Sequence, residues 1–213
     1  MSSTVSDPDT HPSPAEAEIA RRVAELIALA DRPSVPRWRQ FEARPFERYA
    51  PDMSMAGWTV IPQESTGERR PSVVSGVQIK PSDYYYEGSL SGFVQNYNHV
   101  VELSKAAFSK NVAILLGPCS YNTFAIDIDA LDAEIAVRIE LIAERTLGRS
   151  YLRRVGRAPK VALVYRTKEA ADVPRSRPSM TILDRNGEPT ENAVEILGKH
   201  AMLTAYGFHH KTG

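Results

Sequence analysis

The sequence is short of the features that mark secreted and membrane proteins. Among its 213 residues there is one cysteine, Cys119, which excludes an intrachain disulfide and a cysteine-based zinc site. No segment approaches the roughly 18–20 apolar residues that span a bilayer. The N-terminus also lacks the basic start and the apolar run of a secretory signal. We therefore expect a cytoplasmic protein with no membrane partner and no zinc.

The chain also lacks net charge, because 26 basic side chains balance 26 acidic ones. This balance argues at first against a nucleic-acid partner. The charges are segregated, however: residues 121–144 carry six acids and one base, whereas residues 145–177 carry ten bases and two acids. Such an order suits a site that holds metal ions beside bound phosphates. Two solvated surfaces of opposite sign would explain the charge pattern more simply if nothing else supported a site.

The length suits one domain with appendages. Residues 1–13 are rich in Ser, Pro, Asp and Thr and are typical of a disordered tail. Apolar residues at helical spacing after Pro14 predict a helix, within an N-terminal helical appendage over residues 14–42. Residues 43–213 then form the main domain.

In the main domain, strands first alternate with helices and then come in a run. Helical patterns cover Phe41–Tyr49, Leu90–Phe108 and Ala130–Leu147. Strand patterns cover Trp58–Pro62, Val112–Leu116, Thr123–Ile128, Tyr151–Val155, Val161–Tyr165, Ser179–Leu183, Val194–Leu197 and Met202–Tyr206. Pro62 is expected to close the first strand, and the stretch from there to Gly88 is expected to be a long loop. This order favours an α+β fold on a mixed or antiparallel sheet.

Two carboxylates, Asp127 and Asp129, stand at strand spacing at the end of an apolar strand. Alternate strand residues share a face, so these side chains lie about 6–7 Å apart and can share one divalent ion or two. Without a metal, two like charges there would repel each other and be desolvated at considerable cost. The alternative is that Asp129 caps a helix beginning at Ala130, which leaves Asp127 unexplained. We predict a metal-binding pair.

A third carboxylate is expected because Mg²⁺ in phosphoryl-transfer sites is held by few protein oxygens, with substrate phosphates and water. Glu195 is the best candidate, since it lies in the apolar stretch Val194–Leu197, where an unpaired charge is costly to bury. The alternative is a glutamate on the solvent face of an edge strand.

A basic stretch from Arg153 to Arg166 is predicted to form a strand, a turn with Gly and Pro, and a second strand. A rigid hairpin of this kind presents several cations to a triphosphate or a nucleic-acid backbone. The candidate phosphate-binding residues are Arg154, Arg157, Lys160 and Arg166. The alternative is a solvated hairpin whose basic residues protect an edge strand.

Aromatic and histidine residues carry weaker signals. Tyr84–Tyr86 and Trp58 could stack on bases, although aromatic residues more often pack in a core or a loop. His200, His209 and His210 do not predict a metal site without further ligands.

The order of these motifs resembles bifunctional DNA primase/polymerase (Prim-Pol) domains of the archaeo-eukaryotic primase superfamily, which are frequent in phages and plasmids. The resemblance covers about residues 43–213, and the order of the motifs is more specific than any one of them. The stretches that carry it are Gly57–Pro62, Gly117–Asp129, Arg154–Lys160, Val194–Gly198 and Ala205–His209.

The resemblance implies a two-lobed primase-polymerase fold with a catalytic lobe related to the RNA-recognition motif (RRM). It matches Asp127 and Asp129 to the metal-binding motif of the family, and Glu195 to its final acidic position. It further implies two Mg²⁺ or Mn²⁺ ions, a DNA template and primer, and NTPs or dNTPs as substrates. A helicase domain or protein is a further candidate partner. We therefore expect a template-dependent nucleotidyltransferase.

The sequence departs from the family in two ways. The strand beginning at Lys160 lacks the histidine that contacts nucleotide phosphates in many members, so Arg157 or Lys160 would supply that charge. The chain also stops at Gly213, where relatives usually continue, which suggests an excised domain or a short natural form. Two other functions stay open: a metal-dependent nuclease, and a catalytically weak nucleic-acid-binding module of the same fold.

Overall fold

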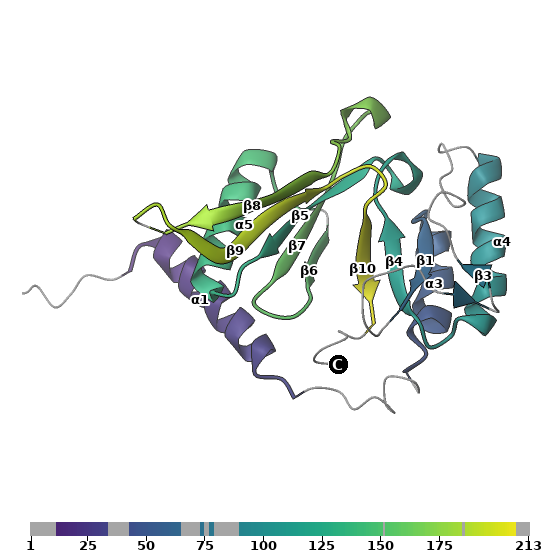
Figure 1. Cartoon of the computed structure of the whole chain (residues 1–213), viewed down its shortest axis with the longest axis horizontal. Coiled ribbons are helices and arrows are strands. Elements are labelled where there is room, and N and C mark those ends of the chain that lie inside the picture. Colours follow the sequence, from purple (N-terminus) through teal and green to yellow (C-terminus); the bar gives the residue numbers. More distant parts are fainter. Residues whose placement is uncertain are drawn as a thin grey trace, which may run out of the picture.

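The computed structural model describes residues 12–33, 43–64, 73–74, 77–78, 90–150, 152–184 and 186–207. The described residues form an α+β fold in which two sheets lie between two pairs of helices (Figure 1). The helices are α1 (Pro14–Ala30), α3 (Pro45–Met55), α4 (Leu90–Ala106) and α5 (Ala133–Leu147), with short 3₁₀ turns at Pro118–Ser120 and Ala170–Asp172. The strands are β1 (Val60–Gln63), β2 (Val73–Val74), β3 (Val77–Gln78), β4 (Asn111–Leu115), β5 (Thr123–Asp129), β6 (Leu152–Val155), β7 (Val161–Arg166), β8 (Arg177–Leu183), β9 (Pro189–Leu197) and β10 (Met202–Tyr206).

The smaller main sheet has the strand order β1-β4-β10, and both pairings are antiparallel. Helices α3 and α4 pack together beside it (Figure 1). Every residue of the central strand β4 is buried. Its core combines Phe46 of α3 and Val100 of α4 with Ile61 and Ile114 of the sheet. These elements form one lobe around its own apolar core.

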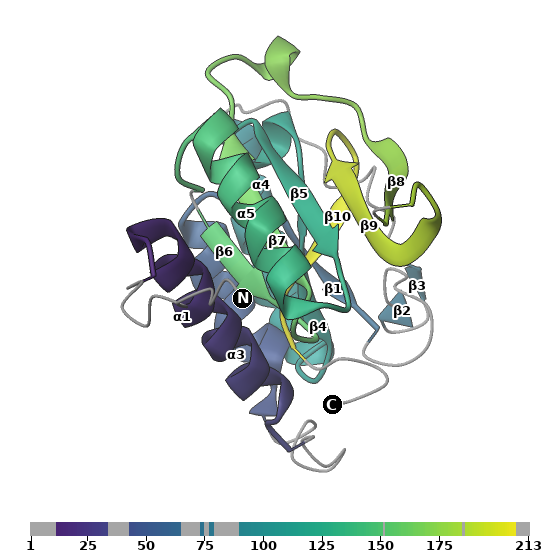
Figure 2. The same ribbon diagram turned by 90° about the vertical axis from the view of Figure 1, so that its left-hand side faces the viewer.

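The larger sheet has the order β6-β7-β5-β9-β8, again with antiparallel pairing throughout. Helix α5 connects β5 to β6, and β7 lies between those two strands, which makes a split β-α-β unit. Figure 2 shows α5 lying across one face of this sheet, with α1 beside it. The core under α5 contains Ile128, Leu163 and Val137, together with the fully buried Leu26 of α1.

The other face of the larger sheet is turned toward the smaller sheet. Ala125 of β5 and Ala162 and Val164 of β7 belong to the same buried cluster as Ile114 of β4 and Leu203 of β10. The small side chains of Ala125 and Ala162 let the two sheets approach closely. We call this surface the inner face of the larger sheet, and the surface under α5 its outer face.

Most elements lie where the periodicity predicts them, but several predictions need correction. Pro62 does not end the first strand, because β1 runs to Gln63 on the edge of its sheet, where the missing N–H of proline is tolerated. The helix predicted at Phe41–Tyr49 extends instead to Met55 and contains Pro51. The strand predicted at Val194–Leu197 begins already at Pro189. The predicted loop before Gly88 contains the short strand pair of β2 and β3.

Residues 1–11 and Tyr84–Tyr86 lie outside the described residues, as do His209 and His210. The predictions made for those segments therefore stay predictions. Within the described ranges, none of the helices combines the length and the apolar character needed to cross a bilayer. The single cysteine, Cys119, is buried, and burial raises the pKa of its thiol to about 11.

Candidate active site

The two predicted metal-binding aspartates lie on the inner face of the larger sheet. Asp127 and Asp129 alternate along β5 with Ile126 and Ile128, which pack in the core under α5. Ala125, two positions before Asp127, packs instead between the two sheets. Both aspartates are partly exposed. The strand therefore directs both carboxylates to the side of the smaller sheet and away from the helices.

Glu195 lies directly opposite Asp127. Strands β5 and β9 pair antiparallel, and their register sets Asp127 against Glu195 and Asp129 against Ala193. Residues that face each other in this way share a face of the sheet, with Cβ atoms about 5 Å apart. β9 lies between β5 and β8, so the alternative of an edge strand does not hold for Glu195. The pairing thus brings together the three carboxylates that the sequence singled out.

The capping alternative for Asp129 is also excluded. The N-cap of α5 is Asp132, whose carboxylate accepts a hydrogen bond of 2.9 Å from the backbone N–H of Ile135. Asp129 instead forms an ion pair with Lys160, at the start of the neighbouring strand β7. The alternative was wrong because the helix begins three residues later than predicted, at Ala133.

The basic hairpin of β6 and β7 adjoins the carboxylates. Arg154 pairs with Ala162, which in turn pairs with Asp127 on the other side, so the three share the inner face. Arg154 and Asp127 are thus separated by about 10 Å, or two strand spacings. Ala162 is too small to block the path between them. Both charged residues have interaction partners, so neither is a free charge.

The turn of the hairpin shapes the position of Arg154. A Cβ atom added to Gly156 would come within 2.9 Å of Nη1 of the Arg154 guanidinium. Glycine at this position therefore lets the guanidinium lie over the turn. Arg157, next in the turn, is exposed. The hairpin holds Arg154, Arg157 and Lys160 at the end of the sheet where β5 carries its aspartates.

Arg166 lies apart from this group. It pairs with Thr123, at the opposite end of β5 from Asp129, and is about 13 Å along the strand from Ala162. Its guanidinium stacks over the ring of Tyr121 at 4.6 Å from the centroid. Trp58 meets the same ring edge-on. It also packs against the apolar core around the smaller sheet, so its contacts in the described part of the chain are packing contacts.

The donor chemistry of the three carboxylates fits Mg²⁺ or Mn²⁺, which prefer oxygen ligands. Asp129 already pairs with the Lys160 ammonium, which a metal ion at this carboxylate would have to displace. Among the described residues, no group of three or more His, Cys, Asp or Glu is gathered tightly enough to count as a metal site. The carboxylates are therefore grouped by strand register and would need side-chain adjustment to share an ion.

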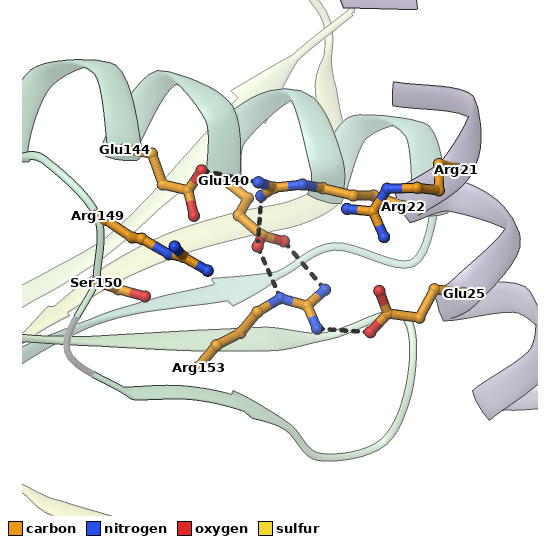
Figure 3. A pocket seen from close by; sticks show the side chains of 8 residues that line it. All are labelled: Arg21, Arg22, Glu25, Glu140, Glu144, Arg149, Ser150 and Arg153. Carbon is orange, nitrogen blue, oxygen red and sulfur yellow. Dashed lines mark hydrogen bonds and ion pairs between the residues drawn. The ribbon is translucent and has the colours of Figure 1, made fainter. Parts of the chain in front are cut away.

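A second charged site occupies the outer side of the same lobe, in a pocket of about 420 Å³ (Figure 3). Glu140 of α5 is fully buried there and accepts hydrogen bonds from Arg22 of α1 at 2.9 Å and from Arg153 of β6 at 2.7 Å. Arg153 also bonds to Glu25, as the dashed lines in Figure 3 show. Burial alone would lower the pKa of Arg22, but hydrogen bonds to Glu144 and Glu18 raise it. These charges neutralise one another and stabilise the contact of α1 with α5 and β6.

This network was missed by sequence reasoning. Arg153 stands within the predicted phosphate-binding stretch, but strand alternation turns it to the outer face while Arg154 turns to the inner one. One feature of the sequence did indicate the network: Glu140 lies on the apolar side of an amphipathic helix. A glutamate buried there requires a basic partner. The position of that partner depends on how α1 docks, and no local pattern fixes it.

Comparison with models of known protein families found no match, and no curated protein matched the chain.

Proposed function

We propose that this chain is a template-dependent nucleotidyltransferase, a DNA primase/polymerase of the Prim-Pol type acting in phage or plasmid replication. The observation that carries the proposal is the register of β5 and β9, which sets Glu195 opposite Asp127. Asp129 lies two residues further along β5, on the same face. The basic hairpin lies on the other side of β5. Acidic and basic residues that are far apart in the sequence thus share one end of the inner face.

In this proposal Asp127, Asp129 and Glu195 hold two Mg²⁺ or Mn²⁺ ions. Such ions lower the pKa of a primer 3′-hydroxyl and stabilise a pyrophosphate leaving group. The protein residues orient the reactants. Like charges directly opposite each other on paired strands repel, and a cation bound by Asp127 and Glu195 would relieve that repulsion.

The cationic residues of the hairpin bind the triphosphate of the incoming NTP or dNTP. Arg154 offers a planar guanidinium fork, which suits bidentate contact with phosphate oxygens, and Lys160 offers a point charge. Arg157 is exposed in the turn between them. Together they replace the histidine expected from the family resemblance, and they act through position and electrostatics. Arg166 lies about 13 Å further along β7 from Ala162 and stacks on Tyr121, so it stands apart from these three residues.

The architecture supports the same proposal. The split β-α-β unit of the larger sheet is a feature of ferredoxin-like folds, the class expected of an RRM-like catalytic lobe. The proposed site lies on its inner face, toward the second lobe. A DNA template and primer are the proposed partners, and a helicase domain or protein is a further candidate partner.

The test is incubation of the purified protein with a labelled primer on a DNA template, with Mn²⁺ or Mg²⁺ and with or without nucleotides. Primer growth that requires both nucleotides and metal supports the proposal. Primer shortening without nucleotides would instead identify a nuclease. DNA binding that weakens steeply with salt, without either reaction, would identify a binding module.

A further inference from the structure

The ion pair between Lys160 and Asp129 joins the basic hairpin to the carboxylate group. The Lys160 ammonium contacts Oδ1 of Asp129, and the two side chains are 30% and 50% exposed, respectively. Val161 pairs with Ile128, so Lys160 is the residue of the hairpin that comes next to Asp129. A basic residue of the proposed triphosphate site therefore already contacts a proposed metal ligand.

The backbone of Lys160 is held while its side chain can swing. Its N–H donates to the carbonyl of Arg157 at 3.0 Å, and its carbonyl accepts a longer bond of 3.4 Å from the N–H of Gly156. A lysine has four methylene groups and a single charged end, so it can exchange partners without moving the turn. An arginine at the same position would grip a carboxylate with two parallel bonds and exchange less readily.

The charges around this contact favour such an exchange. The carboxylates of Asp127, Asp129 and Glu195 share the inner face with two hairpin cations, Arg154 and Lys160. The exposed Arg157 adds a third cation in the turn, so the formal charges of the carboxylates and the hairpin balance. A divalent ion that binds Asp129 must displace the ammonium or suffer its repulsion. The displaced ammonium then lies beside a newly cationic centre, where an anionic triphosphate is the natural partner.

We propose that Lys160 is an exchangeable counter-ion. It neutralises Asp129 when no divalent ion is bound, and it passes to the triphosphate when the ion binds. This inference rests on the proposed function for the identity of the site, and it adds an order to the binding. Lys160 opposes metal binding in the absence of a triphosphate and supports triphosphate binding in the presence of the metal, so metal and nucleotide bind cooperatively.

The test measures binding of Mn²⁺ alone by electron paramagnetic resonance to the wild-type chain and to Lys160→Met, Lys160→Arg and Lys168→Met. Because an exposed ion pair of this kind is weak, we expect Lys160→Met to bind Mn²⁺ about fivefold more tightly than wild type. Lys160→Arg should bind it more weakly than wild type. The control Lys168→Met, which removes an exposed lysine beyond the end of β7, should match wild type.

A second measurement uses inorganic tripolyphosphate with Mn²⁺ present and follows its affinity by calorimetry. Lys160→Met should lose affinity for tripolyphosphate although it gains affinity for Mn²⁺. Replacing a lysine with a purely structural role would not change these two affinities in opposite directions. Equal Mn²⁺ affinity in all variants, or Mn²⁺ binding in none of them, would overturn the inference. Opposite shifts in a protein that incorporates no nucleotide would uphold the exchange and refute the polymerase proposal.

Discussion

At the scale of single residues, Asp127 and Glu195 place two acidic side chains at paired positions of the larger sheet. The two acids face each other across neighbouring strands, where opposite charges or apolar pairs are stabilising and like charges are not. Asp129 has Lys160 beside it. A metal ion bound by Asp127 and Glu195 would relieve their mutual repulsion.

This repulsion makes a stability prediction. Glu195→Gln keeps the shape of the side chain and removes one like charge, so its free energy of unfolding in EDTA should rise by about 0.5–1 kcal/mol. Added Mn²⁺ should then stabilise wild type more than the variant. Denaturant unfolding with and without the metal measures both effects.

The matched control is Glu191→Gln, which changes an exposed glutamate of the same strand beyond its pairing with β5. It should shift the unfolding free energy by less than about 0.5 kcal/mol in either condition. A Glu195→Gln variant that is less stable than wild type in EDTA would show that Asp127 and Glu195 do not repel each other.

At the scale of secondary-structure elements, α1 and α5 are joined by a buried charge. Glu140 is fully buried between Arg22 and Arg153, whose side chains are only 17% and 24% exposed. Breaking a buried pair by removing one partner leaves uncompensated charges behind. This buried network therefore stabilises the packing of α1 against α5 and the larger sheet.

Glu140→Gln should accordingly lower the free energy of unfolding by about 3 kcal/mol or more. The control is Glu134→Gln on the same helix, because Glu134 pairs with Arg138 on the exposed surface, where a pair is worth about 1 kcal/mol or less. Denaturant unfolding of both variants provides the measurement. Similar losses of unfolding free energy in Glu140→Gln and Glu134→Gln would show that the network does not stabilise the packing of α1.

The elements themselves were largely predictable from the sequence. The α5 helix and strands β4 to β7 have regular apolar spacing and lie within a few residues of their predicted bounds. The early part of β9 was missed because its start at Pro189 is exposed and polar, and so lacks the pattern of a buried strand. Pro62 misled the prediction, since a proline can stay within an edge strand. The helix predicted to end at Tyr49 runs on through Pro51 to Met55.

The candidate site was predictable only in part. Alternation along one strand is enough to place Asp127 and Asp129 together. The position of Glu195 opposite Asp127 depends on the register of two strands that are more than 60 residues apart, and no local pattern sets that register. The ion pair of Lys160 likewise depends on the pairing of β5 with β7.

At the scale of the whole molecule, two chain segments cross between the lobes and bond to each other. The N–H of Leu116 donates to the carbonyl of Ala201 at 2.8 Å, and the N–H of His200 donates back to Leu116 at 3.3 Å. Gly198, between β9 and β10, lies against the backbone of Pro174. These contacts fix how the acid-bearing strand continues into the other lobe.

Gly198→Ala tests this crossing. A Cβ atom at this position would lie 1.9 Å from the carbonyl oxygen of Pro174, and backbone cannot swing aside as a side chain can. We expect a loss of about 1–3 kcal/mol in the free energy of unfolding. Gly156→Ala is the control, because its added methyl group meets only the mobile end of Arg154. Equal stability of the two variants would contradict a tight crossing at Gly198.

We propose that the carboxylates of the inner face hold the ions for metal-dependent nucleotidyl transfer. The most direct test is the rate of Mn²⁺-dependent primer extension by wild type, Asp127→Asn and the control Glu191→Gln, all at the same folded concentration. Asp127→Asn should lose at least about 100-fold in rate, because it removes charge stabilisation from the reacting centre, while Glu191→Gln should match wild type. Equal rates for Asp127→Asn and wild type would contradict the claim.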